Sequence, residues 1–168
     1  INHLNMKQVY APSLSMLLNK LLLILLLLFT SEFAKAGWNQ VNIGINDHFN
    51  SVLFMSSTHG LIAGNHGIYF TTTGGGTASD WTRFTFTNDP SYLELYNNCQ
   101  FKKIAVYSDY TVYICGTDTV NKRAIIFKLD LSNLKYSFAY VGLKNSSLNA
   151  LAIINSYLFA VGNNGLVL

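Results

Sequence analysis

The sequence predicts an all-β fold, made of antiparallel four-stranded blades of a β-propeller and preceded by a signal-peptide helix. Three observations predict it. An unbroken apolar run stands near the amino terminus, a strand–link–strand pattern that closes on glycine recurs three times, and apolar runs rich in β-branched and aromatic residues follow the first two copies. A chain of 168 residues has room for one ordinary domain.

Residues 1–36 have the organisation of a secretory signal peptide. Lys7 and Lys20 precede the apolar run LLLILLLLF at 21–29, and a small-x-small site follows it. The expected cleavage site comprises Ala34, Ala36 and Gly37. Cleavage there predicts a secreted, periplasmic or cell-surface protein, with membrane contact only during export.

Two other interpretations of this run are an uncleaved membrane anchor and a buried core helix. Nine helical residues span about 14 Å, whereas a bilayer has a hydrocarbon core of about 30 Å. The shorter length favours the signal peptide. Because the chain starts at Ile1 and its first methionine is Met6, we interpret residues 1–5 as upstream translation.

From Gly37 onward the chain is nearly neutral, with six Lys and two Arg against six Asp and one Glu. A nucleic-acid-binding surface needs a basic patch or stripe. The pairs Lys102-Lys103 and Lys122-Arg123 stand isolated from other basic residues. The charge pattern therefore predicts no nucleic-acid partner.

The repeat consists of a strand, a short polar link and a second strand that ends on glycine. Its copies are FNSVLF with LIAG (49–54, 61–64), FKKIAV with YICG (101–106, 113–116) and LNALAI with FAVG (148–153, 159–162). The closing glycines are Gly64, Gly116 and Gly162. A repeat of about 40 to 50 residues is typical of propeller blades, and an unrelated all-β sandwich is the alternative.

Further strands are expected downstream of each hairpin. In the first copy they are 67–71 and 83–87, and in the second they are 124–131 and 136–142. The units are then approximately 37–89, 90–142 and an incomplete 143–168, which makes about two and a half blades. Because propellers close with four or more blades, we expect the chain to be the amino-terminal fragment of a longer protein.

Two turns in the repeat have a conformational explanation. Asn164-Gly165 is a strong signal for a type I′ hairpin turn, which needs positive φ at both central residues. His66-Gly67 holds the same places in the first copy, and histidine tolerates positive φ better than most residues. We therefore expect His66 to have a backbone role and not a catalytic one.

The stretch GNHGIYFTTTGGGTASDW (64–81) resembles the pattern G-x-x-G-x-[IV]-x-x-[ST]-x-D-G-G-x-x-W of the Asp-box propellers. These include the sialidase-like repeats and the photosystem II assembly/stability factor family. The hairpin glycines Gly64 and Gly67 and the corner glycines Gly74 and Gly75 fit the pattern. Thr73 stands where the family has aspartate, and three extra residues precede the tryptophan.

The blade repeat, the signal peptide and the lack of a convergent catalytic set favour a protein-binding or assembly scaffold without enzyme activity, which is our leading hypothesis. The resemblance to the assembly factors implies protein partners. A sialidase-like glycoside hydrolase would need three arginines and a Tyr–Glu pair, whereas the exported part offers only Arg83, Arg123 and Glu94. The alternative is a carbohydrate-active propeller, either a hydrolase or a lectin, with its site in blades outside this chain. A third hypothesis is a surface adhesion or structural module.

No cofactor or metal is expected, because His48 and His59 show no recognisable ligand spacing. In an exported chain, Cys99 and Cys115 could form a disulfide. Pairing of 101–106 with 113–116 across a turn at Ser108-Asp109 would place Cys115 near Lys102, too far from Cys99 for a bond. Two buried thiols are therefore expected.

Overall fold

The computed structural model describes residues 14–30, 40–85, 90–133 and 135–168, which belong to two compact units, 1–40 and 41–168. In the first unit, helix α1 (Leu14–Thr30) has 17 residues. It is about 26 Å long, because the helix also includes residues before the apolar run at 21–29. None of the described helices is both long and apolar enough to span a membrane. The expected cleavage site, Ala34 to Gly37, lies outside the described residues.

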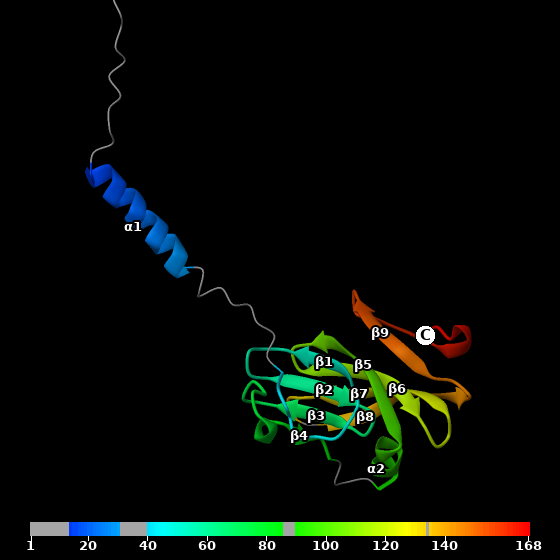
Figure 1. The fold of residues 1–168 in the computed structure, drawn as a ribbon. Coiled ribbons are helices and arrows are strands. Elements are labelled where there is room, and N and C mark those ends of the chain that lie inside the picture. Colours follow the sequence, from blue (N-terminus) through cyan, green and yellow to red (C-terminus); the bar gives the residue numbers. More distant parts are fainter. Residues whose placement is uncertain (1–13, 31–39, 86–89, 134) are drawn as a thin grey trace, which may run out of the picture. The chain divides into compact units, whose positions relative to one another are not determined.

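The second unit contains three antiparallel sheets (Figure 1). The first sheet has the order β1 (Phe49–Phe54), β2 (Gly60–Gly64), β3 (Ile68–Thr71), β4 (Thr82–Arg83). The second has the order β5 (Cys99–Ser108), β6 (Thr111–Asp118), β7 (Arg123–Asp130), β8 (Lys135–Lys144). The third pairs β9 (Leu148–Ile154) with β10 (Tyr157–Gly162). This confirms a mainly β architecture with antiparallel four-stranded sheets.

Three short helices complete the second unit: η2 (Ala78–Asp80), α2 (Pro90–Asn97) and η3 (Asn163–Gly165). Helix α2 was not expected from the sequence. It lies between the first two sheets in the chain, and the fully buried Tyr96 anchors it by accepting a 2.8 Å hydrogen bond from the Ile68 N–H. The predicted strand 83–87 is wrong in extent, because β4 ends at Arg83 and Phe84 turns into the core.

The repeat has a structural counterpart in a β-bulge at the same place in every sheet. Gly64 pairs with Phe49, Gly116 with Phe101, and Gly162 with Leu148. In each first strand one extra residue follows before the pairing resumes, and these residues are Asn50, Lys102 and Asn149. The three hairpins therefore share one register as well as one sequence pattern.

Close approach of the backbone explains why glycine occupies these positions. A Cβ on Gly116 would overlap the carbonyl oxygen of Gln100, and a Cβ on Gly162 would overlap that of Ser147. On Gly64 it would lie 2.5 Å from the Asp47 carboxylate. A bulge brings the two backbones this close, and only glycine has no side chain to displace.

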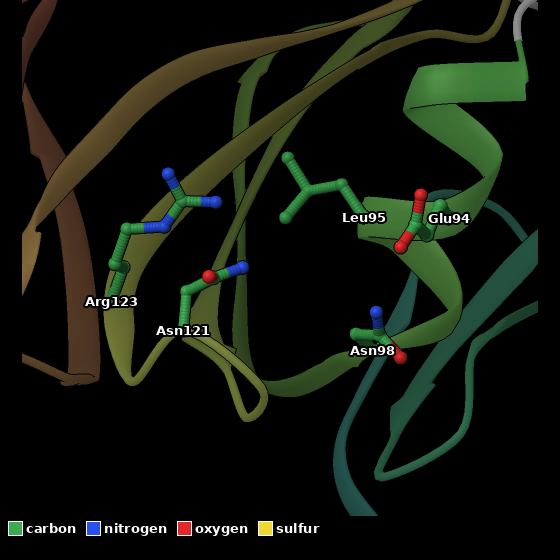
Figure 2. Close-up of a pocket in the computed structure, with 5 residues that line it drawn as sticks. All are labelled: Glu94, Leu95, Asn98, Asn121 and Arg123. Atoms are coloured by element: carbon green, nitrogen blue, oxygen red, sulfur yellow. The ribbon is translucent and has the colours of Figure 1, made fainter.

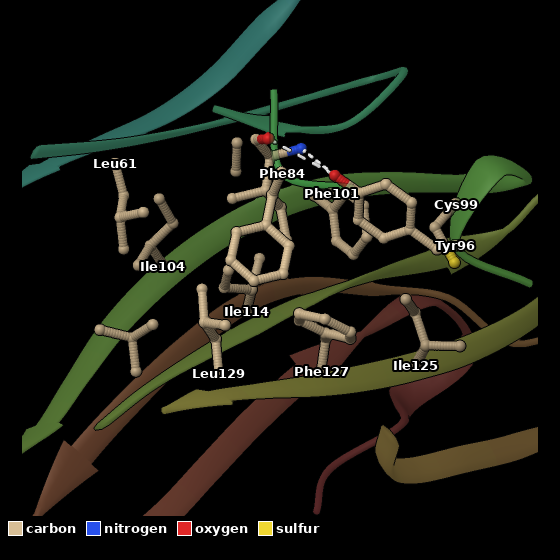
Figure 3. Packing of buried hydrophobic residues seen from close by; sticks show 13 residues of the cluster. Leu61, Phe84, Tyr96, Cys99, Phe101, Ile104, Ile114, Ile125, Phe127 and Leu129 are labelled. Atoms are coloured by element: carbon tan, nitrogen blue, oxygen red, sulfur yellow. Dashed lines mark hydrogen bonds between the residues drawn. The ribbon is translucent and has the colours of Figure 1, made fainter. Parts of the chain in front are cut away.

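The sheets pack face to face in chain order. Between the first and second sheets lies a core that includes Leu61 and Phe84 on one side and Phe101 and Phe127 on the other (Figure 3). The aromatic rings of Phe101 and Phe127 lie 5.9 Å apart in an edge-to-face arrangement, which is a favoured geometry for aromatic pairs.

The opposite face of the second sheet packs on the third. Cys115 and Ile126 from the second sheet and Leu148, Leu151 and Ala160 from the third form this second core. Side chains alternate along a strand, so a central sheet contributes to both cores. The second sheet therefore has no solvent-facing apolar side along its central strands β6 and β7.

The first strands of successive sheets lie side by side. β1 contacts β5, and β5 contacts β9. The Asn50 amide donates a 2.8 Å hydrogen bond to the carbonyl oxygen of Phe101, and the Ile104 N–H donates to the Ser51 hydroxyl at 3.2 Å. Polar side chains thus fix β1 against β5 next to the bulge.

The two cysteines are buried free thiols, as expected. Cys99 belongs to the core between the first and second sheets, whereas Cys115 belongs to the core on the other face. The register differs by one residue from the prediction. Cys115 pairs with Lys103 and not Lys102. The β5–β6 turn is Asp109-Tyr110, which shifts the pairing by two residues, and the bulge between Val106 and Ser108 shifts it back by one.

Candidate functional site

The candidate functional site is the end of the sheets at which each first strand begins, which we call the connection end. Hydrogen bonds join neighbouring connections there. Thr119 N–H donates to Asn98 O at 2.9 Å, Ser146 N–H to Lys122 O at 3.1 Å, and the Asn164 amide to Asn145 O at 3.3 Å. The connection end comprises residues 42–48, 65–67, 94–98, 119–123, 145–147 and 163–165.

A fully buried carboxylate, Asp47, organises the first part of the connection end. It accepts hydrogen bonds from the backbone N–H groups of His48, Asn65 and His66 at 2.7, 3.1 and 3.0 Å. The Tyr69 hydroxyl donates to it at 3.0 Å, and Nδ1 of His66 lies 2.9 Å away. Asp47 therefore ties the segment before β1 to the β2–β3 turn and to β3.

These hydrogen bonds shift two pKa values. Burial opposes ionisation of Asp47, but the bonds from the backbone and ring of His66, from Tyr69 and from the His48 N–H outweigh it and hold its pKa below the usual value. Burial, followed by the bond to the Asp47 carboxylate, raises the pKa of Tyr69 to about 12. Asp47 is thus an ionised acceptor and Tyr69 a neutral donor at neutral pH.

The prediction of positive φ at His66-Gly67 is wrong, since neither residue is among those with positive φ. The Asp47 carboxylate explains the difference, because it bonds the Asn65 and His66 N–H groups and holds the turn in another conformation. Asn164 and Gly165 do have positive φ, at 57° and 73°. The turn that lacks an aspartate partner therefore has the hairpin geometry that its sequence indicates.

Asp47 and His66 are the two residue types that orient and accept a proton in hydrolase triads. The His66 ring is 70% exposed, and its Nδ1 already faces the carboxylate. A triad also needs a nucleophile bonded to Nε2, and the hydrogen bonds of the described residues include none at that nitrogen. Among the described residues, therefore, none is bonded to this pair in the place of a triad nucleophile.

Arg83 bridges the first sheet and α2. Its Nε donates to the carbonyl oxygen of His66 at 3.1 Å, and its Nη2 to the Asn97 side chain at 3.2 Å. The guanidinium also lies 5.5 Å from the centre of the Tyr96 ring, a distance typical of cation–π contacts. These contacts give Arg83 a structural task at the connection end.

A pocket of about 240 Å³ lies between α2 and the β6–β7 turn (Figure 2). Its lining residues are Glu94, Leu95, Asn98, Asn121 and Arg123. Figure 2 shows Arg123 and Asn121 on one side and the α2 residues on the other. The pocket presents amide, guanidinium and carboxylate groups, which can form hydrogen bonds with a ligand.

The buried Asp118 balances the charge of Arg123 beneath this pocket. Its Oδ2 accepts bonds from Arg123 Nη2 at 2.8 Å and from the Asn121 amide at 2.9 Å. Burial raises the cost of ionising Asp118, but the bonds from Asn121 and Arg123 hold its pKa below the usual value. Arg123 is therefore paired within the protein.

A groove of about 260 Å³ lies beside η3, where the second and third sheets meet. It is lined by Tyr140, Leu143, Asn145, Ser146, Asn163, Asn164, Gly165 and Leu166. Asn163 is positioned by its side-chain oxygen, which accepts a 2.7 Å hydrogen bond from Asn149. The groove therefore combines an aromatic ring with several amide groups.

The glycine corner that carries the family resemblance lies away from the connection end. Gly74 and Gly75 have φ of 93° and 69°, and the Trp81 indole donates to the carbonyl oxygen of Gly75 at 3.0 Å. The Thr71 hydroxyl accepts from the Thr73 N–H at 3.2 Å, and Asp80 accepts from the Thr77 N–H at 2.7 Å. In this corner, the backbone N–H groups of Thr73 and Thr77 are thus bonded by the side chains of Thr71 and Asp80.

The remaining glycine of the pattern, Gly67, faces Arg83, and a Cβ on Gly67 would lie 2.7 Å from the Arg83 Nε.

The other two histidines considered in the sequence lie apart from each other. His48 lies next to Asp47, whereas Nδ1 of His59 bonds the Thr58 hydroxyl at 2.9 Å in the β1–β2 turn, at the opposite end of the first sheet. In the part of the chain that the structure describes, no three His, Cys, Asp or Glu side chains gather in a way that could hold a metal ion.

Sequence reasoning missed Asp47 and Asp118 as organising residues. Asp118 had a local signal, since an aspartate followed by Asn121 at the third position is typical of turns in which the side chain bonds the backbone. Asp47 had none, because all its partners except the adjacent His48 N–H lie 18 to 22 residues further along the chain. Comparison of the chain with protein-family models, curated proteins and solved structures gives no match.

Proposed function

We propose that residues 41–168 form successive blades of a β-propeller, and that the exported protein is a non-enzymatic scaffold that binds a protein partner at its connection end. The observation that carries the proposal is the stacking order. Each sheet packs against the next in chain order, while β1, β5 and β9 lie side by side.

Stacked four-stranded meanders with adjacent first strands are the arrangement of propeller blades around a central axis. Each blade cannot bury both of its faces alone, so stability depends on its neighbours. The bulge shared by Gly64, Gly116 and Gly162 supports equivalent roles for the three hairpins. A ring needs four or more blades, so a stack of three needs further sheets on its open faces.

The chemistry of the connection end favours binding over catalysis. Asp47 and Arg123 at this end, and Asp118 and Arg83 in the strands next to it, are engaged in hydrogen bonds within the protein. Its exposed groups are amides and isolated charges such as Glu94, which suit recognition of a polar protein surface. The pocket between α2 and the β6–β7 turn and the groove beside η3 give such an interface its concave regions.

Affinity capture from an envelope extract of cells that produce the full chain tests the proposal. Glu94→Lys reverses an exposed charge at the pocket, and Asp109→Lys makes the matched change in the β5–β6 turn at the opposite end. We expect a reproducible protein partner that is lost with Glu94→Lys and retained with Asp109→Lys. Absence of any partner, or equal loss with both variants, would contradict the proposal.

The groove beside η3 favours a second candidate function, the binding of a glycan. An aromatic ring next to amide groups can contact one face of a sugar and its hydroxyls, and the groove, of about 260 Å³, offers both. Asn164→Gly removes one amide from the groove, and Asn155→Gly is its control because both asparagines have positive φ. A glycan screen in which binding disappears only with Asn164→Gly would support this function.

A further inference from the structure

We propose that Asn145 accepts an N-linked glycan when the chain is exported through a pathway that contains an oligosaccharyltransferase, and that the first sugar of this glycan lies in the groove beside η3. The inference rests on the export included in the proposed function. It adds a modification site and names the sugar attached there, N-acetylglucosamine.

The sequence carries one acceptor pattern for such a glycan. Asn145-Ser146-Ser147 is the only Asn-x-Ser or Asn-x-Thr in the 168 residues. It forms the whole connection between β8, which ends at Lys144, and β9, which begins at Leu148. Acceptor asparagines lie on surface loops of exported proteins, so the place of this pattern in the fold suits the modification.

The Asn145 side chain is available for attachment. The residue is exposed and has the left-handed conformation of a turn, with φ of 65°. Its carbonyl oxygen accepts a hydrogen bond from the Asn164 amide at 3.3 Å, which holds the backbone. Among the described residues, no hydrogen bond involves the Asn145 side-chain amide. A glycan can therefore be linked to Nδ2 without breaking a bond of the fold.

The two serines of the pattern differ in what they do for the fold. The Ser146 hydroxyl accepts a 3.0 Å hydrogen bond from the Ala124 N–H and donates to the carbonyl oxygen of Leu143. The Ser147 hydroxyl oxygen is buried, yet it has no hydrogen-bond partner within the described part of the chain. A buried hydroxyl without a partner costs stability. The glycan acceptor pattern, in contrast, requires serine or threonine at this place.

The modification replaces a hydrogen of the Asn145 amide by the sugar. The donor is an oligosaccharide whose first N-acetylglucosamine is activated as a lipid pyrophosphate, and the exporting cell supplies it. The bond from the sugar C1 to Nδ2 forms, the bond from C1 to the pyrophosphate oxygen breaks, and one amide proton is released. The products are the glycosylated chain and the lipid pyrophosphate.

Asn145 also lines the groove of about 260 Å³ beside η3, together with Tyr140 and Asn164. A sugar linked to Nδ2 therefore starts at this groove. Because the linkage makes its contacts intramolecular, weak contacts are sufficient to hold it there. The linked sugar occupies the place that the second candidate function assigns to a free glycan, so a free glycan can bind there only in a chain without the modification.

Production of the full chain in a eukaryotic host tests the site. A signal sequence of the host precedes the chain, so entry into the export pathway does not depend on residues 1–36. The masses of the unaltered chain, Ser146→Ala and Ser147→Ala are measured before and after an amidase removes N-linked glycans. The control combines Ser147→Ala with Tyr157→Thr, which makes a new acceptor pattern at Asn155. Tyr157 is 71% exposed, and Asn155 also has positive φ, at 49°.

We expect a glycan on the unaltered chain and on Ser146→Ala, none on Ser147→Ala, and one at Asn155 in the control. Urea unfolding of the same chains from a bacterial host without the transferase should give the opposite order. Ser146→Ala should lower the urea midpoint, because it removes two hydrogen bonds. Ser147→Ala should not lower it, because it removes a hydroxyl without a partner. This reversal separates the acceptor role from a structural one.

The position of the sugar is tested after an endoglycosidase has trimmed each glycan to one N-acetylglucosamine. Each trimmed chain is compared with the same sequence from the bacterial host. At Asn145 the sugar should raise Tm by at least about 2 °C. At Asn155 in the control it should leave Tm unchanged, because Asn155 does not line the groove.

The site is overturned if the control carries a glycan and the unaltered chain does not, or if Ser147→Ala keeps its glycan. The position in the groove is overturned if the sugar at Asn145 raises Tm no more than the sugar at Asn155. Failure of residues 1–36 to direct export, or of partner capture at Glu94, is measured separately and contradicts the proposed function instead.

Discussion

The glycine at the β-bulge gives the sharpest prediction about stability. In Gly116→Ala, the new methyl group would overlap the carbonyl oxygen of Gln100. That atom belongs to β5, which is fixed by its pairing with β6 and by the Asn50 and Ser51 bonds beside it. The clash can be relieved only by moving the backbone.

Forcing extra volume into a packed site costs roughly 1–3 kcal/mol, and we expect the upper end, about 3 kcal/mol, because the obstacle is backbone. For a domain of this size, that loss lowers Tm by roughly 10 °C. Gly76→Ala is the control. A Cβ there would lie 4.0 Å from Oδ2 of Asp80, which is ordinary contact, so the expected change is within about 0.5 kcal/mol.

Urea unfolding of the full-length variants, followed by tryptophan fluorescence, measures both changes. If Gly116→Ala lost less than about 1 kcal/mol relative to Gly76→Ala, the close approach at the bulge would not be the reason for glycine.

Three further predictions concern buried polar groups. Asp47→Asn should destabilise the fold by about 2 kcal/mol, because its amide cannot accept from all the N–H and O–H donors that surround the carboxylate; urea unfolding measures this. Asp47 and Asp118 have lowered pKa values in the folded state, so their contribution to stability should be complete above the unfolded pKa of about 4 and lost as pH falls through the folded pKa. The difference in unfolding free energy between the unaltered chain and Asp47→Asn or Asp118→Asn should therefore shrink below that pH. Burial raises the pKa of the Cys115 thiol to about 11 and that of Cys99 well above its usual range. A thiol reagent should therefore modify the native protein slowly, and should modify two thiols per chain after unfolding. If the two cysteines formed a disulfide, no thiol would react.

The sequence predicted the hairpins well, because their signals are local. Alternation in 49–54 and 101–106 and the glycines that close the second strands mark the units that became β1–β2 and β5–β6. The turn at Asn164-Gly165 likewise depends only on the φ preferences of its own two residues.

The missing elements depend on contacts that are distant in the chain. Helix α2 is short and only weakly amphipathic, and Tyr96 reaches a backbone group of β3, 28 residues away. Asp47 organises a turn 18 residues further on, which is also why His66 lacks the φ expected of it. Such partners become visible only once the chain is folded.

The central claim is that β1 lies against β5 and β5 against β9 as neighbouring sheets. A nuclear Overhauser effect between the Ile104 amide proton and the Hβ protons of Ser51 tests it most directly, in the uniformly ¹⁵N-labelled full chain. We predict a clear signal, because the Ile104 nitrogen lies 3.2 Å from the Ser51 hydroxyl oxygen. Its absence, in spectra that do show the Leu53–Leu61 pairing of β1 with β2, would contradict the stacking.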